Sequence, residues 1–403
     1  MSKFFDDLEI RSADDRRRSQ GKLLQMQIER AAALPGYGVA LSVPAGDPFE
    51  ALATLPVLRK SALVEAQTPA APLGGFSSKG PAEFAHLFQS PGPIYEPGGI
   101  GTDWWRMGRF LHALGIGPGD IVQNCFSYHM TPAGMIFENG ARAVGATVFP
   151  AGIGQTELQV RAAHDLGVTA YAGTPDYLKS ILEGADTAGS ELKITKAAVS
   201  GGALFPELRE HYESRGITCL QCYATADLGN IAFESKAMEG MIVDEGVIVE
   251  IVRPGTGQPV PEGEVGEVVV TTLNADYPLI RFATGDLSAV LPGESSCGRT
   301  NLRIKGWMGR ADQTTKIKGM FVRPEQVAEL VARHDEVMRA RVVATRAEDR
   351  DVMVVQIETE LTEPARYAAS VEAVLKLRGD IELVAPGSLP NDGKVIDDMR
   401  EYG

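Results

Sequence analysis

The sequence is short of positive charge. Its 39 lysine and arginine residues stand against 53 aspartate and glutamate residues, which leaves a formal net charge of −14 over 403 residues. Binding to nucleic acid or to an anionic membrane surface depends mainly on lysine and arginine, so we expect neither partner. A local basic site for a small anion remains compatible with this overall balance.

Long apolar runs and paired cysteines are also missing. No window approaches 18 uninterrupted apolar residues, so the sequence predicts no membrane-spanning helix. The first residues show no apolar stretch of the secretory type, and four cysteines do not make a disulfide framework. We therefore expect a cytoplasmic protein.

Several common catalytic motifs do not occur. GxSxG, HExxH and GxxxxGK[ST] are absent, and the six histidines show no metal-ligand spacing. Cys219 and Cys222 are spaced as a Cys-x-x-Cys pair, but they fall inside a predicted strand and no second pair completes a zinc site. We interpret them as small buried residues.

The pattern that is present predicts an α/β domain. From about residue 102, short apolar runs alternate with helical patterns, which indicates a sheet covered on both faces. Residues 40–101 are rich in proline and glycine, which predicts irregular structure with short helical pieces. The expected strands are 121–126, 146–149, 168–172, 196–200 and 217–222, with helices beginning near 102, 131, 156, 175 and 206.

A second, smaller unit is expected at the end of the chain. Residues 247–252 and 267–272 predict ribbon strands. From about Arg310 the pattern predicts a compact α+β unit with its own core. We therefore expect two domains, residues 1–309 and 310–403.

Two small-residue loops are candidates for a binding crevice. Residues 200–203 follow one buried strand and residues 223–227 follow the next, so both are expected at the carboxyl ends of neighbouring strands. A planar base would fit there, and Tyr223 would stack on it. The plain structural alternative is a pair of routine strand-to-helix turns with a tyrosine that packs the core.

Three further segments carry charged candidates. In residues 277–286 a strand is expected to run into a turn that presents Asp286, a carboxylate suited to two ribose hydroxyls. Residues 309–319 suit a hinge, and Lys394 lies on a Gly-flanked tip from which it can reach an anion. Each also fits a structural interpretation, as a turn cap, an interdomain linker and an exposed lysine.

In their order and spacing these segments resemble the adenylate-forming superfamily, in its phenylacetate–CoA ligase branch. The most specific stretches are 277–286, 309–319 with 322–324, and 387–390 leading to Lys394. The stretch 128–159 is also similar. The resemblance implies a large N-terminal α/β domain of adenylate-forming type and a small mobile α+β C-terminal domain.

The resemblance also implies an activity. It is ATP-dependent activation of an aromatic or related carboxylic acid, through an acyl-adenylate, to its CoA thioester, with Mg²⁺ as the cofactor of ATP. Lys394 would be the catalytic lysine, Asp286 would hold the ribose with Arg310 nearby, and Asp312 would be the pivot of the small domain. The implied adenine contacts are Gly201, Gly202, Ala203, Tyr223 and Ala224, the implied Mg²⁺ ligand is Asp227, and the implied acid-pocket residues are Tyr128, His129 and Ala133.

The sequence departs from the family pattern at the phosphate loop. Where the family has a loop of the type SSGTTGKP, residues 88–99 contain three prolines, no lysine and a negative charge at Glu96. Prolines supply no N–H donors, so this segment would be a poor cradle for the β- and γ-phosphates. Some relatives also carry a structural zinc, for which only Cys297 remains here, so we expect no zinc.

Two alternatives therefore stay open. One is an enzyme of the same fold that uses a different acceptor or a preformed acyl-adenylate. The other is a non-catalytic homologue that binds a nucleotide or an acid. The loop-rich N-terminal third offers a surface for a homodimer interface.

Overall fold

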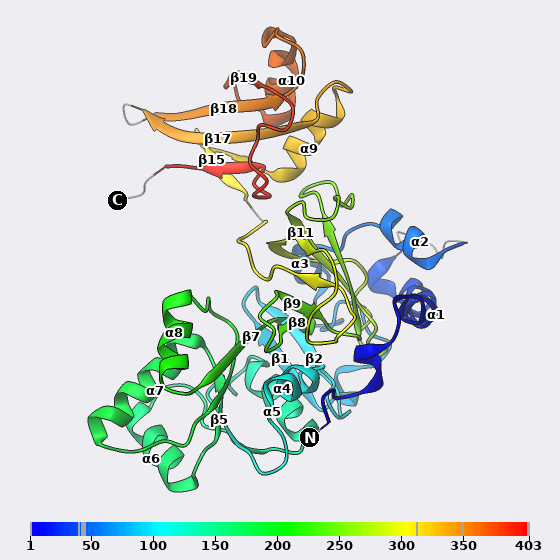
Figure 1. Ribbon diagram of the computed structural model, residues 1–403. Helices are drawn as coiled ribbons and strands as arrows, with labels where there is room; N and C mark the ends of the chain where they lie inside the picture. Colours follow the sequence, from blue (N-terminus) through cyan, green and yellow to red (C-terminus); the bar gives the residue numbers. More distant parts are fainter. Residues whose placement is uncertain (1, 39–40, 42–45, 312, 348–349, 401–403) are drawn as a thin grey trace. The chain divides into compact units, whose positions relative to one another are not determined.

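The computed structural model describes residues 2–38, 41, 46–311, 313–347 and 350–400 (Figure 1). The chain divides into two compact units. Unit 1 comprises Met1–Val249, Val270–Phe282 and Leu291–Gly306, and unit 2 comprises Glu250–Val269, Ala283–Val290 and Trp307–Gly403. The expected boundary between residues 309 and 310 separates two domains that move relative to each other. The two compact units are defined by packing and not by motion, so this boundary stays a prediction.

The largest sheet has nine strands in the order β13-β14-β9-β8-β7-β6-β5-β3-β4. The strands from β4 to β7 pair in parallel, and those from β7 to β14 pair antiparallel. Their bounds are β3 (Ile121–Asn124), β4 (Thr147–Phe149), β5 (Ala170–Gly173), β6 (Lys196–Val199), β7 (Thr218–Thr225), β8 (Gly229–Glu234), β9 (Met241–Val243), β13 (Val290–Leu291) and β14 (Arg303–Ile304).

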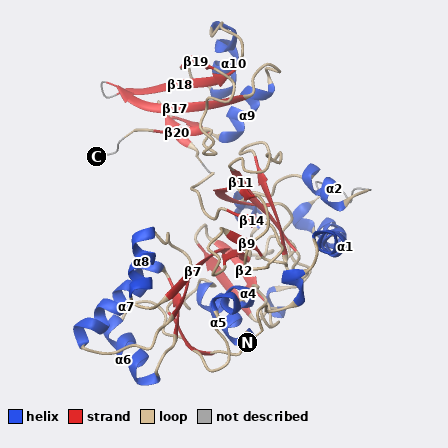
Figure 2. Cartoon of the chain, viewed as in Figure 1, coloured by secondary structure: helices blue, strands red, loops and turns tan. Residues whose placement is uncertain are grey.

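Helices cover both faces of this sheet, as Figure 2 shows. Side chains alternate along the strands. Ala170, Ala172 and Ala198 pack with α4 and α5, whereas Tyr171 and Val199 pack with α6, α7 and α8. The α/β prediction is confirmed. The helices are α4 (Gly108–Leu114), α5 (Ala133–Ala143), α6 (Thr156–Leu166), α7 (Pro175–Ala188) and α8 (Pro206–Ser214).

One predicted helix start is wrong. The helix expected from Thr102 begins at Gly108, because Asp103 and Arg106 adopt left-handed backbone conformations with φ of 53° and 63°. The helix expected near residue 156 begins at Thr156, as predicted, and its N-cap residue Gln155 has φ of 53° and no side-chain cap. Positive φ at non-glycine residues, as at Asp103 and Arg106, is predicted poorly by sequence patterns.

The N-terminal part contains the short helical pieces that its composition predicts, and also an antiparallel hairpin that was not expected. Strands β1 and β2 pair Ser90 with Ile94 across the turn. The sequence did not predict β2 because its apolar and polar residues do not alternate with burial. Glu96 is polar but is buried, as is the apolar Ile94 two residues before it. The elements are α1 (Ala13–Ala32), α2 (Pro48–Thr54), α3 (Lys60–Ala66), β1 (His86–Ser90), β2 (Ile94–Gly98) and three 3₁₀ turns at Asp7–Ile10, Pro35–Tyr37 and Pro81–Glu83.

Unit 2 holds a four-stranded sheet in the order β19-β18-β17-β20, packed on α9 and α10. Strand β20 was missed in the sequence because it has three residues and pairs in parallel with β17. A further sheet has three strands in the order β10-β11-β12. The bounds are β10 (Val247–Val252), β11 (Gly266–Thr272), β12 (Phe282–Ser288), β15 (Thr315–Ile317), β16 (Met320–Val322), α9 (Pro324–Ala332), β17 (Arg339–Ala347), β18 (Arg350–Glu358), α10 (Ala365–Leu375), β19 (Asp380–Val384) and β20 (Ile396–Asp398).

None of the helices in the described ranges is long and apolar enough to cross a membrane.

A buried ion pair attaches α1 to the rest of unit 1. The guanidinium of Arg16 donates to both carboxylate oxygens of Glu245, from Nη2 at 2.9 Å and from Nε at 3.1 Å. Arg11 donates to the same carboxylate at 2.5 Å. The side chains of Arg16 and Glu245 are only 8% and 2% exposed, so each needs the other as its counter-charge.

We predict that Glu245→Ala destabilises the protein by about 3–5 kcal/mol, because it leaves two guanidinium groups without their buried partner. Glu29→Ala, an exposed change on α1, is the control and should cost less than about 1 kcal/mol. Urea denaturation of both variants measures the difference, and equal stabilities would show that the pair contributes little.

Candidate functional site

The loop after β6 lies at the carboxyl edge of the parallel part of the sheet. Strands β6 and β7 are parallel neighbours, with Val199 opposite Gln221, so the ends of the two strands meet at one edge as expected. Gly201, Gly202 and Ala203 are all exposed there. The backbone of Gly201 has φ of 72°, which a residue with a Cβ adopts only with strain.

Tyr223 and Ala224 do not lie on a loop, which corrects the sequence prediction. Both belong to β7, which continues to Thr225 because it pairs antiparallel with β8. The register shifts between Tyr223 and Ala224, so the strand carries an irregularity at this point. Tyr223 is 8% exposed and Ala224 is half-buried, which puts both side chains at the end of the sheet.

Asp227 occupies the turn between β7 and β8 and has a lysine partner. Lys60, the first residue of α3, places its Nζ 3.0 Å from Asp227 Oδ2. The Asp227 side chain is only 2% exposed, whereas that of Lys60 is 42% exposed. The second carboxylate oxygen, Oδ1, is buried and has no hydrogen-bond partner among the described residues.

A second carboxyl group faces Asp227 from the hairpin. Glu96 is 1% exposed, and its Oε1 accepts a hydrogen bond from the Ser90 hydroxyl. Burial and the charge of Asp227 raise the pKa of Glu96 to about 8. Glu96 therefore holds its proton at neutral pH, which limits the negative charge beside Asp227, opposite Lys60.

Tyr277 completes this carboxyl cluster, which we define as Glu96, Asp227, Lys60, Ser90 and Tyr277. The tyrosine is 1% exposed, and its hydroxyl has no hydrogen-bond partner among the described residues. Burial first, and then the charges of Asp227 and Glu96, raise its pKa well above the ordinary value. Sequence reasoning found Glu96 as a negative charge but missed Lys60, because nothing in the local pattern of α3 connects it to residues 96 and 227.

In unit 2, Asp286 and Arg310 are brought together as the resemblance implies. Asp286 Oδ1 accepts from Arg310 Nη1 at 2.8 Å and from Trp307 Nε1 at 3.1 Å. The expectation that Asp286 stands on a turn is wrong, because it lies within β12 and forms a β-bridge with Arg310. The Arg310 side chain is 57% exposed, so this ion pair borders solvent.

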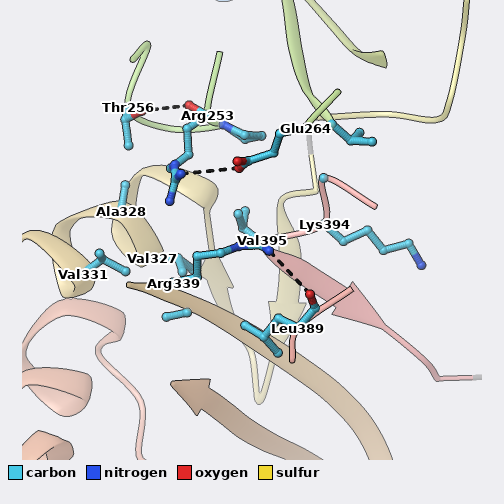
Figure 3. Close-up of a pocket in the computed structure, with 14 residues that line it drawn as sticks. Arg253, Thr256, Glu264, Val327, Ala328, Val331, Arg339, Leu389, Lys394 and Val395 are labelled. Atoms are coloured by element: carbon cyan, nitrogen blue, oxygen red, sulfur yellow. Dashed lines mark hydrogen bonds and ion pairs between the residues drawn. The ribbon is translucent and has the colours of Figure 1, made fainter. Parts of the chain in front are cut away.

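Lys394 also belongs to unit 2 and stands on the expected glycine-flanked tip. Gly393 has φ of 71°, and a Cβ there would lie 2.8 Å from Val265. The Lys394 Nζ lies 2.8 Å from Asp397 Oδ1, and its side chain points away from a small cavity of about 50 Å³ (Figure 3). Asp312, the expected pivot, lies outside the described residues.

The three acid-pocket candidates lie around the start of α5. The Tyr128 hydroxyl accepts a hydrogen bond from Asn124 at 2.7 Å, and burial raises its pKa. His129 is exposed, and Ala133 is the first residue of α5. Their roles stay predictions.

The described residues contain no group of three or more His, Cys, Asp or Glu side chains that could hold a metal ion. Asp227 would therefore be a single protein ligand of Mg²⁺, and the phosphates of a bound nucleotide would supply other ligands. This role stays a prediction.

Comparison with known proteins shows what this chain is similar to. Residues 127–274 match the family model of AMP-binding enzymes. A 2-hydroxyisobutyryl-CoA ligase, solved with its acyl-adenylate and CoA, shares the fold with a TM-score of 0.70 at 23% identity, over 99% of this chain and 93% of that one. The chain therefore contains a segment of AMP-binding type and has the fold of that ligase.

The chain is also similar in sequence to phenylacetate-coenzyme A ligases. It is 31% identical to the enzyme of Thermus thermophilus over 266 residues, which are 64% of this chain and 59% of the relative. It is 29% identical to the enzyme of Escherichia coli over 323 residues, which are 72% of each chain. The match thus spans about three fifths of the length of the Thermus relative.

The carboxyl cluster makes a pH-dependent contribution to stability. The pKa of Glu96 is about 8 in the folded protein against an ordinary value of 4.5, so the unfolded chain loses this proton first as pH rises. The stabilising contribution of the protonated group is fully present at low pH and is lost as pH rises towards about 8.

We predict that Glu96→Gln, which cannot ionise, removes this dependence. Relative to the wild type, the variant should gain on the order of 4 kcal/mol in free energy of unfolding between about pH 5 and pH 9. Urea denaturation at the two pH values measures the change, with Glu65→Gln on α3 as the exposed control. A parallel pH dependence in wild type and Glu96→Gln would contradict the buried, protonated pair.

Proposed function

We propose that this protein activates an aromatic or related carboxylic acid with ATP, through an acyl-adenylate, and transfers the acyl group to coenzyme A. The observation that carries the proposal is the AMP-binding match over residues 127–274, in a chain that retains Asp286 and Lys394 in the expected sequence context. Similarity to phenylacetate-coenzyme A ligases supports an aromatic acid.

The first half-reaction brings a carboxylate towards the α-phosphate of ATP, so two anions approach each other and a cation lowers the barrier. We assign this task to Lys394. Its present partner, Asp397, forms an ion pair with a lysine side chain that is 47% exposed. Such a pair is weak in water, so Lys394 can exchange Asp397 for a phosphate at little cost.

Nucleotide binding is assigned to residues of each unit. In unit 2, Asp286 would accept hydrogen bonds from the ribose hydroxyls, and its contacts with Arg310 and Trp307 hold the carboxylate in place. In unit 1, the exposed Gly201 and Gly202 would let the adenine approach the backbone closely. Both assignments come from the resemblance and are open to mutation.

Asp227 is the residue that would hold Mg²⁺, because its buried Oδ1 has no hydrogen-bond partner among the described residues. When bound, Mg²⁺ supplies charge neutralisation of the phosphates. The protonated carboxyl of Glu96 limits the negative charge next to Asp227. Besides Lys60, the pair is therefore suited to one bound Mg²⁺ ion and not to two.

A second candidate function is favoured by the β1–β2 hairpin. In place of a phosphate loop, this segment presents a buried glutamate and a turn with two prolines at residues 91 and 93. An enzyme of the same fold that receives a preformed acyl-adenylate needs no site for the β- and γ-phosphates. The same observation thus supports a reaction that starts after adenylation.

Lys394→Ala tests the first proposal directly. We predict that it slows adenylation by about 100-fold or more, whereas thioester formation from a preformed acyl-adenylate changes by less than about threefold. Single-turnover assays of each half-reaction, with Lys193→Ala as the exposed control, measure the two rates. Equal losses in both half-reactions would contradict the role given to Lys394.

The two candidate functions predict different nucleotide affinities. An ATP-using ligase should bind Mg²⁺–ATP at least as tightly as AMP and should exchange labelled pyrophosphate into ATP with a carboxylic acid present. An enzyme fed with acyl-adenylate should bind AMP at least about tenfold more tightly than Mg²⁺–ATP and should show no exchange with any acid of an aromatic and aliphatic panel. Calorimetry and the exchange assay together decide between them.

A further inference from the structure

Unit 1 contains a cavity of about 640 Å³ that the proposed function does not use. Four basic side chains line it, those of Lys3, His112, Lys236 and Arg299, together with the thiol of Cys297. Among the described residues that line it, none is acidic. We call this the basic cavity.

This lining is unusual for a protein with a net charge of −14. Lysine and arginine make up fewer than one residue in ten of the chain, yet three line the basic cavity. A concave surface lined by one sign of charge concentrates its field and raises the local concentration of ions of opposite sign. The lining therefore favours a small anion over a neutral or cationic molecule.

Arg299 is held rigidly at this cavity and keeps a donor without a partner. It is 5% exposed, its Nε donates to Glu9, and its guanidinium carbon lies 5.4 Å and 5.9 Å from the ring centres of Phe4 and Phe233. Its Nη2 is buried without a hydrogen-bond partner among the described residues. A guanidinium with an unused N–H group is suited to a carboxylate.

Cys297 is the one cysteine of the four that is not buried. Its Sγ lies 3.2 Å from the Ser295 hydroxyl, which also lies 3.0 Å from Glu239 Oε2, and 3.9 Å from Arg299 Nη1. Burial opposes ionisation, but the hydrogen bond from Ser295 and those from Arg299 and Ser235 outweigh it and lower the pKa of the thiol. By contrast, burial raises the pKa of Cys125, Cys219 and Cys222 to about 12.

We propose that the basic cavity is a modification site at which Cys297 exchanges with a low-molecular-weight disulfide that carries carboxylates. The Cys297 thiolate attacks one sulfur of the disulfide, a new S–S bond forms, and the second half leaves as a thiolate, so one disulfide is consumed and one mixed disulfide is made. The cations attract the carboxylates, and Ser295 and Arg299 stabilise the attacking thiolate.

The test compares an anionic with a neutral disulfide on the full chain. Glutathione disulfide, which is anionic, and 2-hydroxyethyl disulfide, which is neutral, are each reacted with the protein. Each rate is divided by the rate of the same disulfide with free 2-mercaptoethanol, which removes differences in intrinsic reactivity. Mass spectrometry of peptides then locates the adducts. We expect one adduct per chain, on Cys297, and none in Cys297→Ser. The normalised rate should be about tenfold higher for glutathione disulfide at low salt, and high salt should remove most of this advantage.

Two variants separate steering by charge from simple exposure of the thiol. Lys236→Gln removes one cation of the cavity and should slow the reaction with glutathione disulfide about threefold while leaving the neutral disulfide unaffected. Lys193→Gln, an exposed change outside the cavity lining, should alter neither rate. Adducts mainly on other cysteines, or equal normalised rates for both disulfides at every salt concentration, would overturn the proposal.

Discussion

The parallel pairing of β6 with β7 is the constraint on which the arrangement of unit 1 depends. Parallel strands end at the same edge of a sheet, so the chain segments that follow them are brought together whatever their sequence separation. Because helices cover both faces, most side chains of these strands are buried, and the apolar ones pack in two clusters, one on each face. The polar groups of the candidate site are thereby confined to the strand ends and to the segments that pack against them.

Compensation of buried charge is the second theme of the structure. Glu245 is matched by two arginines, whereas the Glu96–Asp227 pair has one lysine and holds one proton. In the first arrangement both carboxylate oxygens accept hydrogen bonds from arginine, and the cluster serves the packing of α1. The second retains unpartnered oxygens, as is common where a site must accept a ligand. Charge pairing thus distinguishes a structural cluster from a candidate functional one.

Sequence patterns located the regular part of the fold well. The strands expected in 121–126, 196–200 and 247–252 and the helix of 156–166 all exist within one or two residues, because apolar periodicity there reflects burial directly. The errors have a different cause. Tyr223 lies in a strand because β7 continues into a hairpin with β8, and Asp286 lies in β12, where it forms a bridge with Arg310.

By itself, the sequence determined the class of fold, the family resemblance and the residue types available for chemistry, since these depend on local periodicity and on motif order. Only the tertiary structure decided that Glu96 is buried against Asp227, that Lys60 faces both charges, and that Cys297 lies among cations. The physical reason is that burial and electrostatic partners depend on contacts between segments more than 100 residues apart, such as residues 96 and 227. Local patterns carry no record of those contacts.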